Sequence, residues 1–313
     1  MSKLTHKITD HLYIWTIILG VVCLLTACAS PVKGNTDSLD GLKAMGKSND
    51  NWSASSSRKN DTKIRDMALK EMALSLGAQG GLACRAKAID EALSKQARYL
   101  DSVFDFNSLL IDNNIMPPVL LEGRNTLNMP DTQAIRISDR TYKVAKQAHF
   151  VTTPPNWHQY LWMDYKKPEP IDSSFLPKTK PEQHMWDLYV TKGWHKGFEQ
   201  ANTILEENLA RIKEDLDGMI LYRKLLAMNM VSAPFVSHTD LGITGDASEI
   251  HIDDRVLRIT ALPALNLNSQ EWRAAIAKDE NILEQFTNME KSVQAAKITI
   301  SGQSWQPTIS PIS

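Results

Sequence analysis

Cysteine is nearly absent from this sequence of 313 residues, which contains only Cys23, Cys28 and Cys84. Cys23 lies within the first hydrophobic run and Cys28 just after it, so Cys84 alone remains for a folded domain. One thiol cannot close a disulfide within the chain. We therefore expect the hydrophobic core to hold the fold, and Cys84, in a helical pattern, to be a buried structural thiol.

The sequence also lacks an excess of charge of either sign. Its formal net charge is -1 at pH 7. A protein that binds nucleic acid or an anionic membrane surface through its overall field carries a clear positive excess. We therefore expect no direct nucleic-acid binding.

Motifs that carry catalysis or bind cofactors are missing as well. The histidines do not have HExxH or HxH spacing, no serine lies in GxSxG or SxxK, and the glycine pairs lack the lysine of a phosphate-binding loop. The sequence predicts no catalytic residues, no metal site and no cofactor. We expect a protein that is not an enzyme.

A hydrophobic run long enough to span a bilayer, roughly 20 residues, is not found either. The run from Leu12 to Leu25 has 14 residues and follows a basic start with Lys3, His6 and Lys7. This order of basic, apolar and small residues is typical of a secretory signal peptide. We assign residues 1–27 to such a signal.

The end of this run, Leu25-Thr26-Ala27-Cys28, resembles the lipobox of bacterial lipoproteins. The resemblance implies cleavage before Cys28, lipid on its sulfur and stable anchoring by two or more acyl chains. Ala29, rather than aspartate, follows the cysteine, which resembles signals for the outer membrane. An uncleaved anchor or an ordinary signal peptide is the alternative. We expect a lipid-anchored protein on the periplasmic face of the outer membrane.

The remaining chain divides by composition. Residues 28–61 are small and polar with few apolar side chains, and they predict a flexible tether. Residues 62–313 form the expected periplasmic domain. Apolar residues at helical spacing predict helices over 62–76 and 82–104, separated by Gly77 and Gly80-Gly81, and thus a helical hairpin. The same spacing predicts one long amphipathic helix over 181–228, with a division into two helices at Asp217-Gly218 as the alternative.

Two short alternating segments predict strands. Residues 134–144 should form one β-hairpin with its turn at Ser138-Asp139, and residues 249–259 a second with its turn at Asp253-Asp254. The two share Ile-x-Ile-x-Asp-Arg at identical spacing. They are either two similar hairpins, which can be neighbours in one sheet, or a chance similarity. The predicted class is α+β: a helical hairpin, a small, mostly antiparallel sheet and one long helix.

Four tryptophans, Trp157, Trp162, Trp186 and Trp194, lie in or next to a proline-rich stretch. Trp186 and Trp194 fall on the apolar stripe of the long helix and should pack in the core. Aromatic residues are also enriched at protein interfaces. We take Trp157 and Trp162 as candidate partner-binding residues, with a sugar-binding platform as the alternative.

Two long strings resemble the DotC lipoprotein family of the Dot/Icm type IVB secretion system and related conjugation lipoproteins of IncI-type plasmids. They are PPVLLEGRNTLNMPDTQAIRISDRTYKVAKQAHFVTTPPNWHQYLWM from Pro117 and DDRVLRITALPALNLNSQEW from Asp253. The resemblance implies a structural subunit of the outer-membrane core complex, for effector or DNA export. It further implies a DotD-like lipoprotein and a DotH-like subunit as partners, and self-assembly in a ring. The alternative is an outer-membrane lipoprotein that binds or modifies peptidoglycan.

Overall fold

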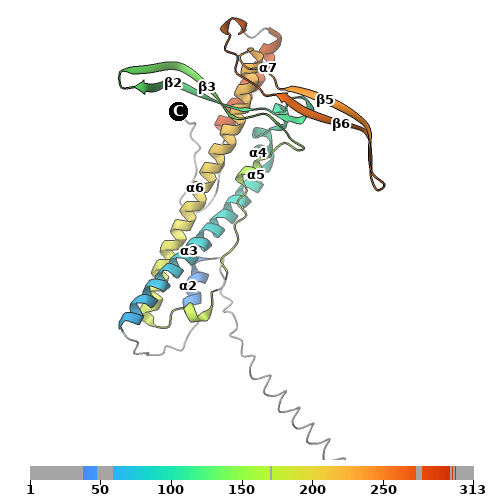
Figure 1. Ribbon diagram of the computed structural model, residues 1–313. Coiled ribbons are helices and arrows are strands. Elements are labelled where there is room, and N and C mark those ends of the chain that lie inside the picture. The colour runs from blue at the N-terminus through green and yellow to red at the C-terminus, as the bar shows by residue number, and fades with distance from the viewer. Residues whose placement is uncertain are drawn as a thin grey trace, which may run out of the picture. The chain divides into compact units, whose positions relative to one another are not determined.

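The computed structural model describes residues 38–47, 59–169, 171–272, 277–296, 298 and 300 (Figure 1). The helices are α2 (Leu39–Lys47), α3 (Lys59–Lys95), α4 (Ala97–Val103), α5 (Trp157–Leu161), α6 (Lys180–Ala227) and α7 (Ala277–Ala295). The strands are β1 (Ile115–Met116), β2 (Val119–Asp131), β3 (Ala134–Lys146), β4 (His149–Phe150), β5 (Phe235–Gly245) and β6 (Ile250–Ala261). All strand pairs are antiparallel, so the predicted α+β class is confirmed.

The chain forms two compact units. Unit 1 contains the described residues up to 84 together with 165–200, and unit 2 contains 85–164 and 201 onward. Helices α3 and α6 each contribute their first part to unit 1 and their second part to unit 2. The predicted long helix over 181–228 is confirmed as α6.

The core of unit 1 includes a helix from the segment that we expected to be a flexible tether. In α2, Leu42 and Met45 are buried against Trp186 and Val190 of α6. The indole Nε1 of Trp186 donates to the carbonyl oxygen of Leu42 at 3.2 Å. The tether prediction is wrong for residues 39–47, because three apolar residues spaced by three form a stripe that the polar composition of the whole segment concealed.

The predicted helical hairpin is also wrong, since α3 continues without a break through Gly77, Gly80 and Gly81. These glycines serve close packing instead of a turn. A Cβ placed at Gly77 would lie 2.3 Å from the carbonyl oxygen of Val190, and one at Gly81 would lie 2.2 Å from that of Trp194. Only a residue without a side chain allows the backbones of α3 and α6 to approach this closely.

Helix α6 contributes two glycines that are likewise four residues apart. A Cβ at Gly193 would lie 2.2 Å from the carbonyl oxygen of Leu74, and one at Gly197 would lie 1.9 Å from that of Ala78. Helices α3 and α6 therefore each present a pair of glycines to the backbone of the other. Such pairs allow two helices to pack with their backbones almost in contact.

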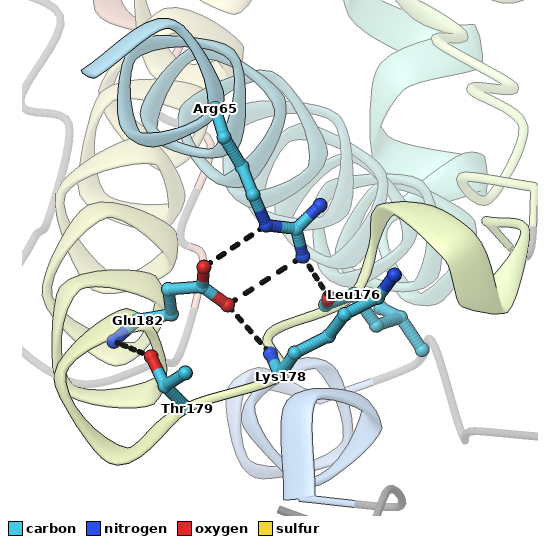
Figure 2. Close-up of polar contacts among 5 residues, drawn as sticks. All are labelled: Arg65, Leu176, Lys178, Thr179 and Glu182. Atoms are coloured by element: carbon cyan, nitrogen blue, oxygen red, sulfur yellow. Dashed lines mark hydrogen bonds and ion pairs between the residues drawn. The ribbon is translucent and has the colours of Figure 1, made fainter. Parts of the chain in front are cut away.

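The start of α6 is fixed by a polar network that Figure 2 shows. Thr179 accepts a hydrogen bond from the Glu182 amide at 3.4 Å, and the Glu182 carboxylate accepts one from the Lys178 amide at 2.6 Å. Arg65 of α3 donates to that carboxylate at 2.9 Å and to the Leu176 carbonyl at 3.1 Å. Burial raises the pKa of Glu182, but these hydrogen bonds and the charge of Arg65 outweigh it and lower the pKa overall. Thr179 and Glu182 occupy the positions of a capping box, with Glu182 reaching back to the amide of Lys178, one residue before the N-cap, and Arg65 adds an ion pair.

The strands of unit 2 form two long ribbons whose turns differ from the predicted ones. Strands β2 and β3 pair as one two-stranded sheet, and β5 and β6 pair as another. The turns lie between Asp131 and Ala134 and between Gly245 and Ile250. Asp131 accepts from the Gln133 amide at 2.7 Å, and Asp246 accepts from the Ser248 amide at 2.7 Å. Aspartates that bond to the backbone two residues on initiate turns, which explains both positions.

The predicted signal peptide (1–27), Cys28 and the flanking parts of the tether lie outside the described residues. Among the helices that are described, none combines the length and apolar character needed to cross a membrane.

Candidate interaction surfaces on two ribbons

The β2–β3 pair, which we call the first ribbon, is held to α6 by a buried carboxylate. Lys146, at the end of β3, donates to both oxygens of Asp215 at 2.6 and 2.7 Å. The hydroxyl of Tyr160, in α5, donates to the same carboxylate at 2.9 Å. Burial and the neighbouring Asp215 raise the pKa of Tyr160, so it remains a neutral donor. These contacts tie β3 and α5 to one point on α6.

Apolar packing secures the same end of the first ribbon. Leu120 of β2 is buried with Tyr222 and Leu225 of α6, and Tyr142 and Val144 of β3 pack on this cluster. A Cβ at Gly218 of α6 would lie 2.8 Å from the carbonyl oxygen of Leu120. The base of the ribbon is therefore fixed on α6.

The β5–β6 pair, the second ribbon, is anchored at the end of the same helix. Val231 forms a bridge with Leu265, and the Ser232 amide donates to the Ala264 carbonyl at 2.9 Å. The hydroxyl of Tyr222 in α6 donates to the carbonyl of Ser232 at 3.2 Å. Both ribbons thus have bases fixed to the last turns of α6.

Beyond these bases, each ribbon exposes an apolar cluster near its turn. In the first ribbon Leu127 lies opposite Ile137, and these side chains are 70% and 68% exposed. In the second ribbon Ile243 lies opposite Ile252, and both are 74% exposed. An exposed isoleucine lies two residues nearer each turn, on the same face by strand alternation. We call Leu127, Ile135 and Ile137 the first tip cluster, and Ile243, Ile250 and Ile252 the second.

The Ile-x-Ile-x-Asp-Arg repeat has a structural meaning, because it places equivalent residues at equivalent points of β3 and β6. Ile135 and Ile137 correspond to Ile250 and Ile252. The strand partners Leu127 and Ile243 were missed in the sequence. The signal for Leu127 was its alternation with Met129 in the sequence.

The ribbons carry opposite charge. Residues 119–146 contain five basic and three acidic side chains, of which Lys146 is paired with Asp215 of α6, whereas residues 235–261 contain two basic and five acidic ones. Histidines are counted as neutral here. The first ribbon therefore has a positive balance and the second a negative one.

The two tryptophans proposed as partner-binding residues differ in exposure. Trp157 is only 1% exposed, and its Nε1 donates to Asp101 at 2.7 Å. A side chain enclosed in this way belongs to the core and does not reach a partner. Trp162 is 42% exposed, so only Trp162 stays a candidate contact residue. Trp186 is buried in unit 1, as predicted.

A cluster of charged residues joins α6 to α7. Lys224 pairs with Glu290 of α7, and Arg223 lies 5.4 Å from the ring centroid of Phe286. Burial and the charge of Glu290 raise the pKa of Asp217 to about 6, although Lys213 and Lys224 oppose this shift. One carboxylate oxygen of Asp217 is buried without a hydrogen-bond partner. The cluster holds α7 on α6, but at neutral pH the carboxylates of Asp217 and Glu290 repel each other.

Within the described part of the chain, no group of three or more His, Cys, Asp or Glu side chains is arranged to hold a metal ion. Cys84 is half-buried in α3. In unit 2, the two tip clusters are apolar surfaces that the chain itself leaves exposed.

Comparison with known proteins gives one family match. Residues 63–274, about two thirds of the chain, match the family described as "Type IV secretory system, conjugal DNA-protein transfer". The matched range includes α3 from residue 63 onward, both ribbons and α6. Among curated proteins, no sequence matches this chain significantly.

Proposed function

We propose a structural role in a secretion machine, on the premise that this chain belongs to the type IV secretory family for conjugal DNA-protein transfer. Membership gives a role related to type IV secretion and conjugation. The observation that supports a structural subunit is the pair of tip clusters, in which six aliphatic side chains lie exposed on ribbons with fixed bases. Exposed apolar patches of this kind mark sites where a protein binds partners.

The proposal extends to location and partners. The lipobox at Cys28 supports a lipoprotein, and the resemblance to the DotC family supports a place in the outer-membrane core complex. The chain would then act there as a non-enzymatic scaffold, beside a DotD-like lipoprotein and a DotH-like subunit. The fixed bases suit a scaffold, because the clusters are presented without having to order a loop first.

Fractionation followed by affinity isolation tests this proposal. Wild type, Cys28→Ala and the control Cys84→Ala would be expressed in cells that carry the complete secretion machine. We expect wild type and Cys84→Ala in the outer membrane, together with other secretion subunits. We expect Cys28→Ala to lose both the membrane fraction and most of these subunits. A wild type that is isolated alone, or only with peptidoglycan, would contradict the scaffold role.

A further inference from the structure

We propose that neighbouring copies of this chain bind each other through unlike ribbons, the first tip cluster of one copy packing on the second tip cluster of the next. The inference rests on the proposed function, since it specifies how copies of a scaffold subunit would meet. Its occupant is a second copy of the same chain. Three features of the ribbons support it.

The first feature is matching geometry. Each cluster consists of a cross-strand aliphatic pair and an isoleucine two residues nearer the turn, in a two-stranded ribbon. Two such surfaces have similar width and chemistry, so that side chains of one can interdigitate with those of the other. Packed sheets bury their apolar faces in this way.

The second feature is the isolation of each ribbon beyond its base. A two-stranded ribbon in water is marginally stable, and it needs a further layer against its apolar face. The base of the first ribbon has that layer in α6, where Leu120 is buried, whereas no residue of β5 or β6 is buried. Neither tip has such a layer: the six cluster residues are between 61% and 74% exposed. A ribbon from another copy would supply the missing layer.

The third feature is charge, and it selects unlike over like contacts. Apart from Lys146, which pairs with Asp215 at the base, the first ribbon has four basic and three acidic residues, and the second has two basic and five acidic ones. A contact between the first ribbons of two copies would place positive surfaces together, and a contact between their second ribbons would place negative surfaces together. A contact between the first ribbon of one copy and the second ribbon of the next brings opposite charges together, which favours this arrangement over the other two.

A contact between unlike surfaces has a further consequence. Each copy keeps one unused ribbon after binding a neighbour, so the same contact can be repeated from copy to copy. Such a series closes into a ring if the rotation between copies allows it. The arrangement would supply the ring expected for the secretion complex without a dedicated oligomerisation domain.

Two complementary variants test the pairing directly. Ile137→Asp disables the first tip cluster, and Ile252→Asp disables the second. Leu267→Asp serves as the matched control, because it changes an exposed aliphatic residue, 93% exposed, that lies outside both ribbons. The full chains would be purified in mild detergent, and their mass would be measured by sedimentation velocity over a range of concentrations.

We expect wild type and Leu267→Asp to form oligomers. Each ribbon variant alone should associate at least about tenfold more weakly, since a charge replaces a buried aliphatic group. An equal mixture of the two variants should form a dimer that does not grow, because one intact first cluster meets one intact second cluster. Association of the mixture should weaken as salt is raised.

Several outcomes would overturn the inference. They are a wild type that stays monomeric, a ribbon variant that still self-associates as the wild type does, and a mixture that gains nothing over its components. Far-UV circular dichroism and thermal melting of each variant would show whether it is folded. A monomeric wild type that still isolates secretion subunits from cells would refute this pairing and leave the scaffold role intact. Variants that lose binding to detergent-free lipid vesicles, with no self-association in the wild type, would assign the clusters to a lipid surface instead.

Discussion

The contact between α3 and α6 in unit 1 predicts that a single methyl group will destabilise the protein. Gly197→Ala adds a Cβ that would lie 1.9 Å from the carbonyl oxygen of Ala78. An ordinary carbon–oxygen contact is about 3.3 Å or longer. The two backbones must therefore separate by more than 1 Å at this point, and Gly193 would lose its close contact with α3 as well.

Two opposing effects determine the magnitude. Alanine favours the helix over glycine by about 1 kcal/mol. Forcing an extra carbon into a packed interface costs about 1–3 kcal/mol, and the obstacle here is backbone that cannot change its rotamer. Because the methyl group also spoils packing along the neighbouring turns, we place the cost in the upper part of that range, about 2–3 kcal/mol. Subtracting the helix preference of alanine leaves an expected net loss of about 1–2 kcal/mol.

Urea unfolding followed by circular dichroism measures this loss. Lys196→Ala is the matched control, because it lies next to Gly197 in the same helix, is exposed and introduces the same residue. We expect the control to change the free energy of unfolding by less than about 0.5 kcal/mol. A Gly197→Ala protein that is as stable as the wild type, or more stable through its helix propensity, would refute the close approach of the two backbones.

Three further predictions concern unit 2. The pKa of Asp217 is raised from its ordinary value of 3.8 to about 6; the folded state therefore binds its proton more tightly, and stability falls as pH rises from about 4 through 6. Asp217→Asn should remove this dependence and raise the free energy of unfolding at pH 7.5 by on the order of 2 kcal/mol, whereas an unchanged pH profile would contradict it. Lys146→Met should lower the free energy of unfolding by about 2 kcal/mol and Asp215→Asn by less, because only the first change leaves a buried carboxylate without its cation. The reverse order in urea unfolding would be inconsistent with the ion pair between Lys146 and Asp215. Trp157→Phe removes the hydrogen bond to Asp101 and should lower the free energy of unfolding by about 1–2 kcal/mol, seen as a lower melting temperature. Trp162→Phe should change the melting temperature little.

The helices show which features a sequence reveals and which it conceals. The 48 residues of α6 were predicted almost to the residue, since their apolar stripe repeats over many turns. The prediction failed at Gly77 and Gly81, because glycine in a helix has two opposite interpretations: it ends the helix, or it admits a neighbouring backbone. Only the position of Val190 and Trp194 opposite these glycines distinguishes the two.

The ribbons were recognised as β-structure but divided at the wrong places. Ser138-Asp139 has the composition of a turn, yet it continues β3, because its partners on β2 are available at the right register. Asp253 has a positive φ of 58° and still lies within β6, where an irregular register accommodates it. Strand pairing between distant segments decides such cases, and local composition does not contain that information.

The candidate site was predictable only in part. The two isoleucines of each repeat were visible as a pattern, but their exposure was not, since alternating isoleucines normally indicate a buried face. The tryptophans misled for a related reason, because a clustered aromatic can serve either a core or an interface. The exposed fractions of Trp157 and Trp162 separate these two roles.

The four glycines at the contact between α3 and α6 also limit which sequence changes this protein can accept during evolution. A substitution in a side-chain interface can be compensated by a smaller residue on the opposite helix. That remedy fails where the opposite group is peptide backbone, as it is at Gly77, Gly81, Gly193 and Gly197. Mutational drift at these positions therefore has no second-site remedy short of re-spacing the helices. In a collection of related sequences, the four sites should be almost invariant as a group, while the exposed residues between them, Gln79, His195 and Lys196, vary freely.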